Sequence, residues 1–84
     1  MCVLVADLPV PAALRTVSAT SAFLETNARP APGAEVRLRH PDAGTIDAVV
    51  DSISGEGVAL RFACTERSVA FALAAIAADM TRPA

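Results

Sequence analysis

Polar and apolar residues alternate in three short runs through the middle of the chain. The runs are residues 35–40, 45–52 and 58–63. Alternation with a period of two places every second side chain on one face of a β-strand. The segments between the runs, residues 41–44 and 53–57, have the proline, aspartate, serine and glycine content of tight turns. We therefore expect three antiparallel strands whose apolar faces point into a common core.

The side chains predicted to face this core all belong to apolar residues of the three runs. They are Val36, Leu38, Ile46, Ala48, Val50, Val58, Leu60 and Phe62. The opposite face carries Arg37, Arg39 and Asp47, which a hairpin of the first two strands would bring close together. Cross-strand pairs of opposite charge contribute about 0.2–1 kcal/mol each. We interpret these charges first as a solvated face that neutralises itself.

Three further strands are predicted upstream of these runs. They span residues 3–6, 12–17 and 22–26. Pro9 and Pro11 favour an edge position for the stretch that contains them, because proline cannot donate a hydrogen bond to a strand ladder. Residues 18–21 are predicted to form a polar turn, and residues 27–33, which include two prolines, a loop.

A helix is predicted over about residues 66–80. Thr65 can cap its first turn, and Glu66 places a negative charge where the helix dipole favours one. Pro83 marks the end of the helix, because proline cannot continue it. At helical spacing, the apolar residues of this segment form two stripes on opposite sides.

We expect one of these stripes to face the core and the other to bind a partner. The predicted core stripe comprises Val69, Leu73, Ile76 and Met80. The predicted partner-binding stripe comprises Phe71, Ala75 and Ala78. Phe71 is large and its neighbours carry no charge, which favours contact with a protein partner or with a second copy of the chain. The alternative is a small tolerated patch, since single exposed apolar residues are normal.

The chain is short and rich in apolar residues. Its 84 residues make a single domain, 1–84, with strands over about residues 3–63 followed by the helix. The hydrophobic fraction of 54% is high for this size, which favours a surface that a partner covers, although alanine supplies much of it. No run approaches the ~18 apolar residues that span a membrane, and Asp7 interrupts the first apolar run too early for a secretory signal. We expect a cytoplasmic protein without membrane insertion.

The charged residues point away from nucleic-acid binding. The formal net charge is −2, whereas affinity for DNA or RNA comes chiefly from cations that neutralise phosphates. The absence of tryptophan and tyrosine also disfavours a base-stacking platform. All seven basic residues are arginine, which together with abundant alanine indicates the coding bias of a GC-rich bacterium.

Catalytic and metal-binding chemistry has few candidate residues in this chain. His40 is the one histidine and lies at the end of a predicted strand beside Pro41 and Asp42, so we interpret it as a turn residue and not as a catalytic base. One histidine with Cys2 and Cys64 cannot make an ordinary four-ligand zinc site. We expect no catalytic site, no metal and no cofactor. The two cysteines are interpreted as reduced thiols, with a disulfide between them as the alternative.

The turns and strands also follow a characteristic order from residue 17 to about residue 78. Residues 18–26 are similar to a turn and the strand after it in the PilZ domain, residues 32–39 resemble its next strand, and residues 45–50 and 57–62 its closing strands. The resemblance implies a mainly β fold, a small antiparallel β-barrel closed by one C-terminal α-helix.

Typical PilZ domains bind the bacterial second messenger cyclic di-GMP with an Arg-x-x-x-Arg segment and an Asp/Asn-x-Ser-x-x-Gly turn. This chain has no two arginines four residues apart, and its turn reads Thr16-x-Ser18-x-x-Ser21. We therefore expect a degenerate PilZ-like adaptor that signals through protein–protein contact. The alternative is an atypical cyclic di-GMP receptor, in which Arg15, Ser18, Arg37 and Arg39 would bind the nucleotide, since guanidinium groups supply forked donors to phosphate.

Overall fold

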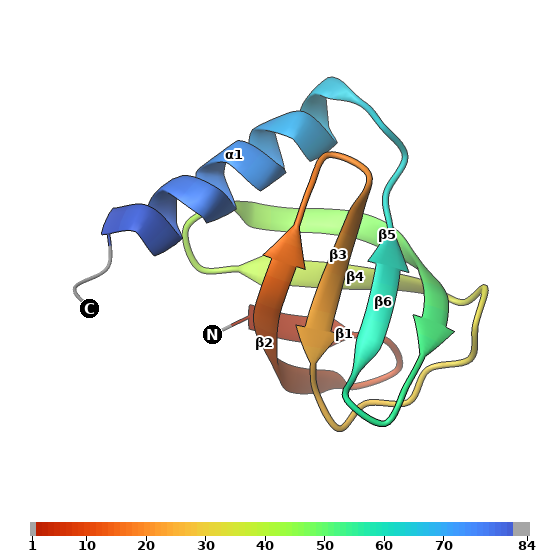
Figure 1. Ribbon diagram of the computed structural model, residues 1–84. Coiled ribbons are helices and arrows are strands. Elements are labelled where there is room, and N and C mark those ends of the chain that lie inside the picture. The colour runs from red at the N-terminus through yellow and green to blue at the C-terminus, as the bar shows by residue number, and fades with distance from the viewer. Residues whose placement is uncertain (1, 82–84) are drawn as a thin grey trace.

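The computed structural model describes residues 2–81 of the chain, and of residues 79–81 only the backbone. The described part forms six β-strands and one α-helix (Figure 1). They are β1 Cys2–Val5, β2 Pro9–Val17, β3 Ser21–Glu25, β4 Glu35–His40, β5 Gly44–Ile53, β6 Val58–Arg61 and α1 Glu66–Thr81. The predicted fold class, a mainly β barrel with one C-terminal helix, is confirmed.

The six strands close into an antiparallel barrel in the order β1-β2-β3-β6-β5-β4. β1 completes the ring because Leu4 lies opposite both Val10 of β2 and Leu38 of β4. β3 pairs with β6 and not with β4, so the loop of residues 26–34 carries the chain around the lower end of the barrel to β4 (Figure 1). Each described strand therefore has two neighbours, which removes the open edge that a flat sheet would present.

β2 is longer than the predicted strand, because it begins at Pro9. Its first half, from Pro9 to Ala12, pairs with β1, whereas pairing with β3 begins at Ala13. Pro9 and Pro11 therefore lie where β2 has a neighbour on one side only, a position that tolerates residues without an N–H donor. This arrangement agrees with the edge character that the two prolines predict.

Two β-bulges bend the wall of the barrel. The additional residue is Arg15 in β2, against β3, and Asp51 in β5, against β6. A bulge bends its strand and increases the local twist. Both bulges lie in the two longest strands, where the bend helps a sheet of six strands to close on itself.

The eight side chains predicted to face inward are all buried. None is more than 5% exposed, and β1 and β3 add Cys2, Leu4, Ala22 and Leu24 to the same core. β6 approaches β3 closely at its start, where a Cβ atom on Gly57 would overlap the backbone carbonyl of Leu24. Glycine is therefore required at this position for the packing of the two strands.

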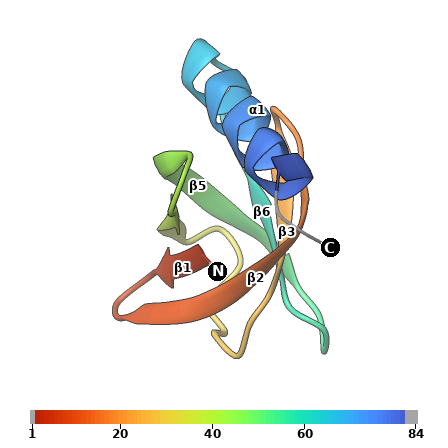
Figure 2. The ribbon, with the colours of Figure 1, turned by 90° about the vertical axis from the view of Figure 1, so that its left-hand side faces the viewer.

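α1 begins with a reciprocal cap between Thr65 and Ser68. Thr65 Oγ1 accepts a hydrogen bond from the Ser68 N–H at 3.3 Å, and Ser68 Oγ accepts one from the Thr65 N–H at 2.9 Å. Two donors at the start of the helix are thereby satisfied, and the predicted cap at Thr65 is confirmed. Ser68 is fully buried, and its Oγ also donates a hydrogen bond to the Thr65 carbonyl at 2.9 Å. The helix lies across one end of the barrel (Figures 1 and 2).

The face of α1 that was expected to meet a partner packs on the barrel instead. Phe71 and Ala75 are each 3% exposed, and Ala78 is half-buried. The Phe71 ring meets the rings of Phe62 and His40 edge-on, with centroid distances of 6.0 and 6.1 Å. Such edge-to-face pairs are favourable beyond the area they bury. The prediction of a partner site at Phe71, Ala75 and Ala78 is therefore wrong, because these residues belong to the packing between helix and barrel.

The stripe that was expected to face the core points into solvent. Val69, Leu73 and Ile76 are 41%, 63% and 42% exposed, and the Met80 side chain lies outside the described part of the chain. Both stripes are apolar, so helical periodicity alone does not choose between them. The helix is rotated so that Phe71 faces the barrel, because burial of an aromatic ring removes more apolar area from water than burial of an aliphatic side chain does.

Candidate functional site

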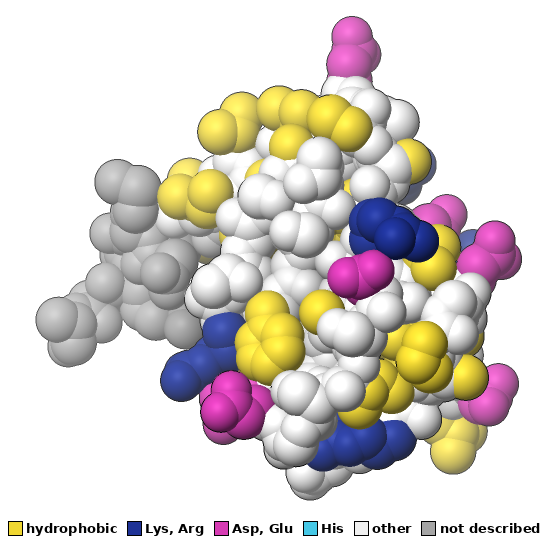
Figure 3. All heavy atoms as spheres, turned by 45° about the vertical axis from the view of Figure 1, so that its right-hand side comes forward, with side chains coloured by type: hydrophobic (Ala, Val, Ile, Leu, Met, Phe, Trp, Pro, Cys, Tyr) yellow, Lys and Arg dark blue, Asp and Glu magenta, His cyan; other side chains and the backbone are white. Residues whose placement is uncertain are grey.

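The outer face of α1, which we define as Val69, Leu73 and Ile76, is an exposed apolar stripe. The separations of four and three residues are those of the seam of a coiled coil. Between Arg67 and Asp79 the helix has no charged residue. Figure 3 shows hydrophobic side chains gathered along α1 at the top of the molecule. Among the described residues, Leu8 in the β1–β2 turn is another large exposed hydrophobic residue, 74% exposed, but it stands apart from this stripe.

Arg37 and Arg39 point outward from β4, as predicted. Arg37 Nε lies 3.1 Å from Asp47 Oδ1 on β5, which confirms the expected cross-strand pair. Arg39 lies opposite Thr45 and has no carboxylate partner in the described part of the chain. Both arginines line a cleft of about 460 Å³ between the β4–β5 hairpin and the start of α1, to which Arg67 also contributes. We call this the β4–α1 cleft.

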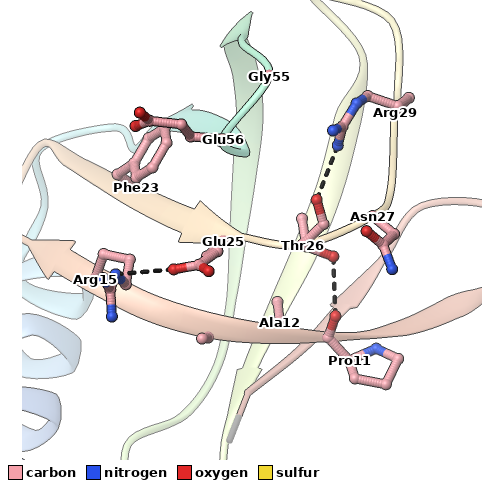
Figure 4. Close-up of a pocket in the computed structure, with 11 residues that line it drawn as sticks. Pro11, Ala12, Arg15, Phe23, Glu25, Thr26, Asn27, Arg29, Gly55 and Glu56 are labelled. Carbon is pink, nitrogen blue, oxygen red and sulfur yellow. Dashed lines mark hydrogen bonds and ion pairs between the residues drawn. The ribbon is translucent and has the colours of Figure 1, made fainter.

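Arg15 lies in a different part of the molecule. Its Nε atom is 3.0 Å from Glu25 Oε2 on β3, and this pair lines an open groove of about 930 Å³ that extends to the β5–β6 turn (Figure 4). Arg29 lines the same groove and donates from Nη1 to the carbonyl oxygens of Thr26 and Ala28, both at 2.8 Å. Each guanidinium group in this groove is therefore already engaged by the protein.

Ser18 organises the turn between β2 and β3. Its Oγ accepts hydrogen bonds from the N–H groups of Thr20 and Ser21 at 3.2 and 3.1 Å, and the Ser18 N–H donates to the Ser21 carbonyl. The predicted polar turn is confirmed. Ser18 lines neither the groove that holds Arg15 nor the β4–α1 cleft. The structure thus does not bring Arg15, Ser18, Arg37 and Arg39 together into one site.

Reactive residues are scattered and engaged in the fold. His40 Nδ1 accepts hydrogen bonds from the N–H groups of Asp42 and Ala43 at 3.0 and 3.1 Å, so the imidazole closes the β4–β5 turn as predicted. Cys2 is buried and Cys64 is exposed, and no disulfide joins them. Among the described side chains of residues 2–78, no group of three or more histidine, cysteine, aspartate or glutamate residues is arranged to hold a metal ion. No helix in the described part of the chain is long and apolar enough to cross a membrane.

Comparison of the chain with protein-family models, with curated proteins and with solved structures finds no match. Its function is therefore argued from the residues of this chain. Two surfaces have features that indicate binding, an exposed apolar stripe and a cleft lined by arginines. They are the outer face of α1 and the β4–α1 cleft.

Neither surface was predicted from the sequence with the residues that form it in the structure. The residues of the outer face of α1 were assigned to the core. Arg37 and Arg39 were named but not Arg67, which only the packing of α1 brings to the same cleft. One signal in the sequence was available for Arg67, namely the absence of an acidic residue three or four positions further along the helix, where an ion-pair partner would lie.

Proposed function

We propose that this chain is an adaptor module that acts by binding an α-helix of a partner protein on the outer face of α1. The observation that carries the proposal is the exposure of Val69, Leu73 and Ile76 on a stripe without charges. Exposed apolar residues scattered singly are normal, but residues lined up at a coiled-coil spacing present a continuous surface. An amphipathic helix packs on such a stripe through apolar residues at the same spacing.

The size of this face favours a different protein over a second copy of the chain. Burial of the exposed parts of the three side chains contributes about 2–4 kcal/mol, at about 1.5–3 kcal/mol for each fully buried aliphatic side chain. A symmetric dimer doubles this to about 4–9 kcal/mol, whereas association itself costs an estimated 4–15 kcal/mol. Self-association through this face alone is therefore weak, and a partner with a broader apolar face of its own is needed.

The resemblance to PilZ domains supports a role in bacterial signalling for this adaptor. A closed barrel of six antiparallel strands with a C-terminal helix is the fold that the resemblance implies, and residues 18–21 connect β2 to β3 where the family's turn was expected. The chain lacks the arginine pair of that family, and the structure separates Arg15 and Ser18 from Arg37 and Arg39. These points favour protein contact over ordinary binding of cyclic di-GMP.

Site-specific photo-crosslinking tests the proposed surface. A photoreactive amino acid replaces Leu73 in one variant and Leu8 in another, because both residues are strongly exposed but only Leu73 lies on α1. In cells of the source organism, we expect one discrete crosslinked protein from position 73 and not from position 8. The protein is then identified and purified, and the complex is reconstituted. Crosslinking to the same protein from both positions, or a purified pair that does not associate, contradicts the proposal.

Two solution measurements separate this proposal from its alternatives. Sedimentation velocity is expected to show a monomer at micromolar concentration, and a stable dimer that Leu73→Glu dissociates would instead identify a second copy as the occupant. Calorimetric titration with cyclic di-GMP is expected to show no micromolar binding. Micromolar affinity that Arg37→Ala or Arg39→Ala abolishes would make the chain a nucleotide receptor and overturn the adaptor proposal.

A further inference from the structure

The arginines of the described chain differ in what engages them. Those at positions 15, 37 and 61 each form an ion pair with a carboxylate on a neighbouring strand, and Arg29 donates to two backbone carbonyls. Arg39 and Arg67 have no such partner among the side chains that the structure describes, those of residues 2–78. These two arginines come from β4 and from the first turn of α1, and they line the same cleft.

The β4–α1 cleft carries an excess of positive charge in an acidic protein. Its charged residues are Arg37, Arg39, Arg67 and Asp47, so guanidinium groups outnumber the carboxylate by two. The Asp47 carboxylate is already bound to Arg37, which leaves the other two arginines to act on a ligand. An acidic average charge does not prevent such a local positive field.

The remaining polar groups of the cleft are hydroxyls. Thr45 and Thr65 line it together with the arginines. Thr65 Oγ1 accepts a hydrogen bond from the Ser68 N–H, and a hydroxyl that accepts can still donate its own hydrogen to a ligand oxygen. Two guanidinium forks and two hydroxyls thus present hydrogen-bond donors from two sides of a cleft of about 460 Å³.

We propose that the β4–α1 cleft binds a phosphoryl group through Arg39 and Arg67, with Arg37, Thr45 and Thr65 completing the site. The guanidinium group matches the oxygens of phosphate with two parallel hydrogen bonds. A phosphomonoester carries about −1.5 to −2 charge near neutral pH, which balances the excess of two positive charges in the cleft. A phosphodiester carries a single charge and fits this balance less well. The site is separate from the outer face of α1, so it goes beyond the proposed adaptor function.

The phosphoryl group can belong to a free phosphorylated molecule or to a phosphorylated side chain of a protein. Either source presents the same terminal oxygens to Arg39 and Arg67. Two probes distinguish these sources, namely inorganic phosphate and a short peptide with a central phosphoserine. A peptide of the same sequence with glutamate in place of phosphoserine tests whether the cleft selects a phosphoryl group over a carboxylate.

In the experiment, each probe is titrated into the ¹⁵N-labelled protein and its binding is monitored by NMR. We expect either phosphoryl probe to shift the Nε–H signals of Arg39 and Arg67 and the backbone amide of Thr65. Arg39→Gln combined with Arg67→Gln should weaken the binding of the better probe by about tenfold or more, because charge-assisted hydrogen bonds are lost. Arg15→Gln combined with Arg61→Gln is the matched control, since it removes two exposed arginines that are already paired, and should change the affinity less than about twofold. Affinity should also fall as the ionic strength rises to physiological levels, where the Debye length is about 8 Å.

Both glutamine substitutions are at exposed side chains and should leave the fold intact, which circular dichroism verifies. A loss of binding in the double variant then reports the loss of the site and not of the fold. Tighter binding of the phosphopeptide identifies a phosphorylated side chain, and tighter binding of inorganic phosphate identifies a free phosphorylated molecule. The proposal is overturned if neither probe shifts these signals, if the double variant binds as well as the wild type, or if the glutamate peptide binds as tightly as the phosphopeptide.

Discussion

The rotation of α1 determines which of its residues stabilise the fold and which are available to a partner, and two alanine substitutions test it. Phe71 is 3% exposed and contacts the rings of Phe62 and His40, whereas Leu73, two residues later, is 63% exposed. The roles expected for these two residues in the sequence analysis are the opposite. Phe71→Ala and Leu73→Ala should therefore change the free energy of unfolding by very different amounts.

The expected magnitudes follow from burial. Truncation of a buried phenylalanine to alanine costs about 3–5 kcal/mol, which includes the cavity it leaves and the lost ring contacts. Leu73→Ala removes a side chain that is mostly in water already and should cost at most about 1 kcal/mol, part of which the higher helix propensity of alanine offsets. A domain of this length has a total stability of about 4–13 kcal/mol. Phe71→Ala therefore removes a large share of it, and Phe71→Leu serves as a milder variant that keeps part of the buried volume.

Urea denaturation followed by far-ultraviolet circular dichroism measures these changes, because the chain has no tryptophan or tyrosine to report by fluorescence. With a slope of about 1 kcal/mol per molar urea for a small domain, Phe71→Ala should lower the midpoint by about 3 M or abolish folding, and Leu73→Ala by less than about 1 M. Phe71→Leu should fall between them. If Leu73→Ala lowers the midpoint as much as Phe71→Ala does, the rotation of α1 described above is incorrect.

Three further substitutions or reactions probe other parts of the structure. Gly57→Ala should destabilise the protein by about 1–3 kcal/mol, because the added Cβ atom would overlap the β3 backbone. Its control is Gly55→Ala, whose Cβ atom would meet no atom within 4 Å and which should change stability by less than about 0.5 kcal/mol. Equal thermal midpoints for the two variants would contradict the close approach of β3 and β6. Ser18→Ala removes an acceptor for two backbone N–H groups and should lower stability by about 0.5–1.5 kcal/mol in the same melting assay, and no change would show that the turn does not depend on this hydroxyl. Cys64 should react with a thiol reagent in the native protein and Cys2 only on unfolding, so two rapidly reacting thiols would contradict the burial of β1.

Most strands and their buried faces could be predicted from the sequence because local pattern and local chemistry agree there, whereas the closed barrel was implied by the resemblance to PilZ domains. Alternation placed Val36 and Leu38 in the core, because turning the other face of β4 inward would bury Arg37 and Arg39 and leave both apolar side chains in water. The cap at Thr65 follows from its side chain and from the residues after it, within one turn of helix. Such features depend on neighbours in sequence, which a single sequence displays directly.

The faces of α1 and the β4–α1 cleft could not be predicted in the same way because they depend on distant residues. Phe71 is buried because Phe62 and His40 meet its ring, and Arg67 joins Arg39 because the helix folds back over the β4–β5 hairpin. A helix whose residues are apolar on both sides leaves its rotation to tertiary packing. The pairing of β3 with β6 is likewise a property of the closed barrel and not of either strand, because even the paired positions closest in sequence, Leu24 and Val58, are 34 residues apart.

The central claim is that the outer face of α1 binds the partner, and the affinity of the purified partner for matched variants tests it most directly. Calorimetry compares the wild type with Leu73→Glu, which places a charge at the centre of the stripe, and with Leu8→Glu, the same change at an exposed leucine remote from it. We predict that Leu73→Glu weakens binding by about tenfold or more, because an unpaired charge would be buried in the interface, and that Leu8→Glu leaves binding unchanged. Full affinity in Leu73→Glu, or an equal loss in both variants, would contradict the account.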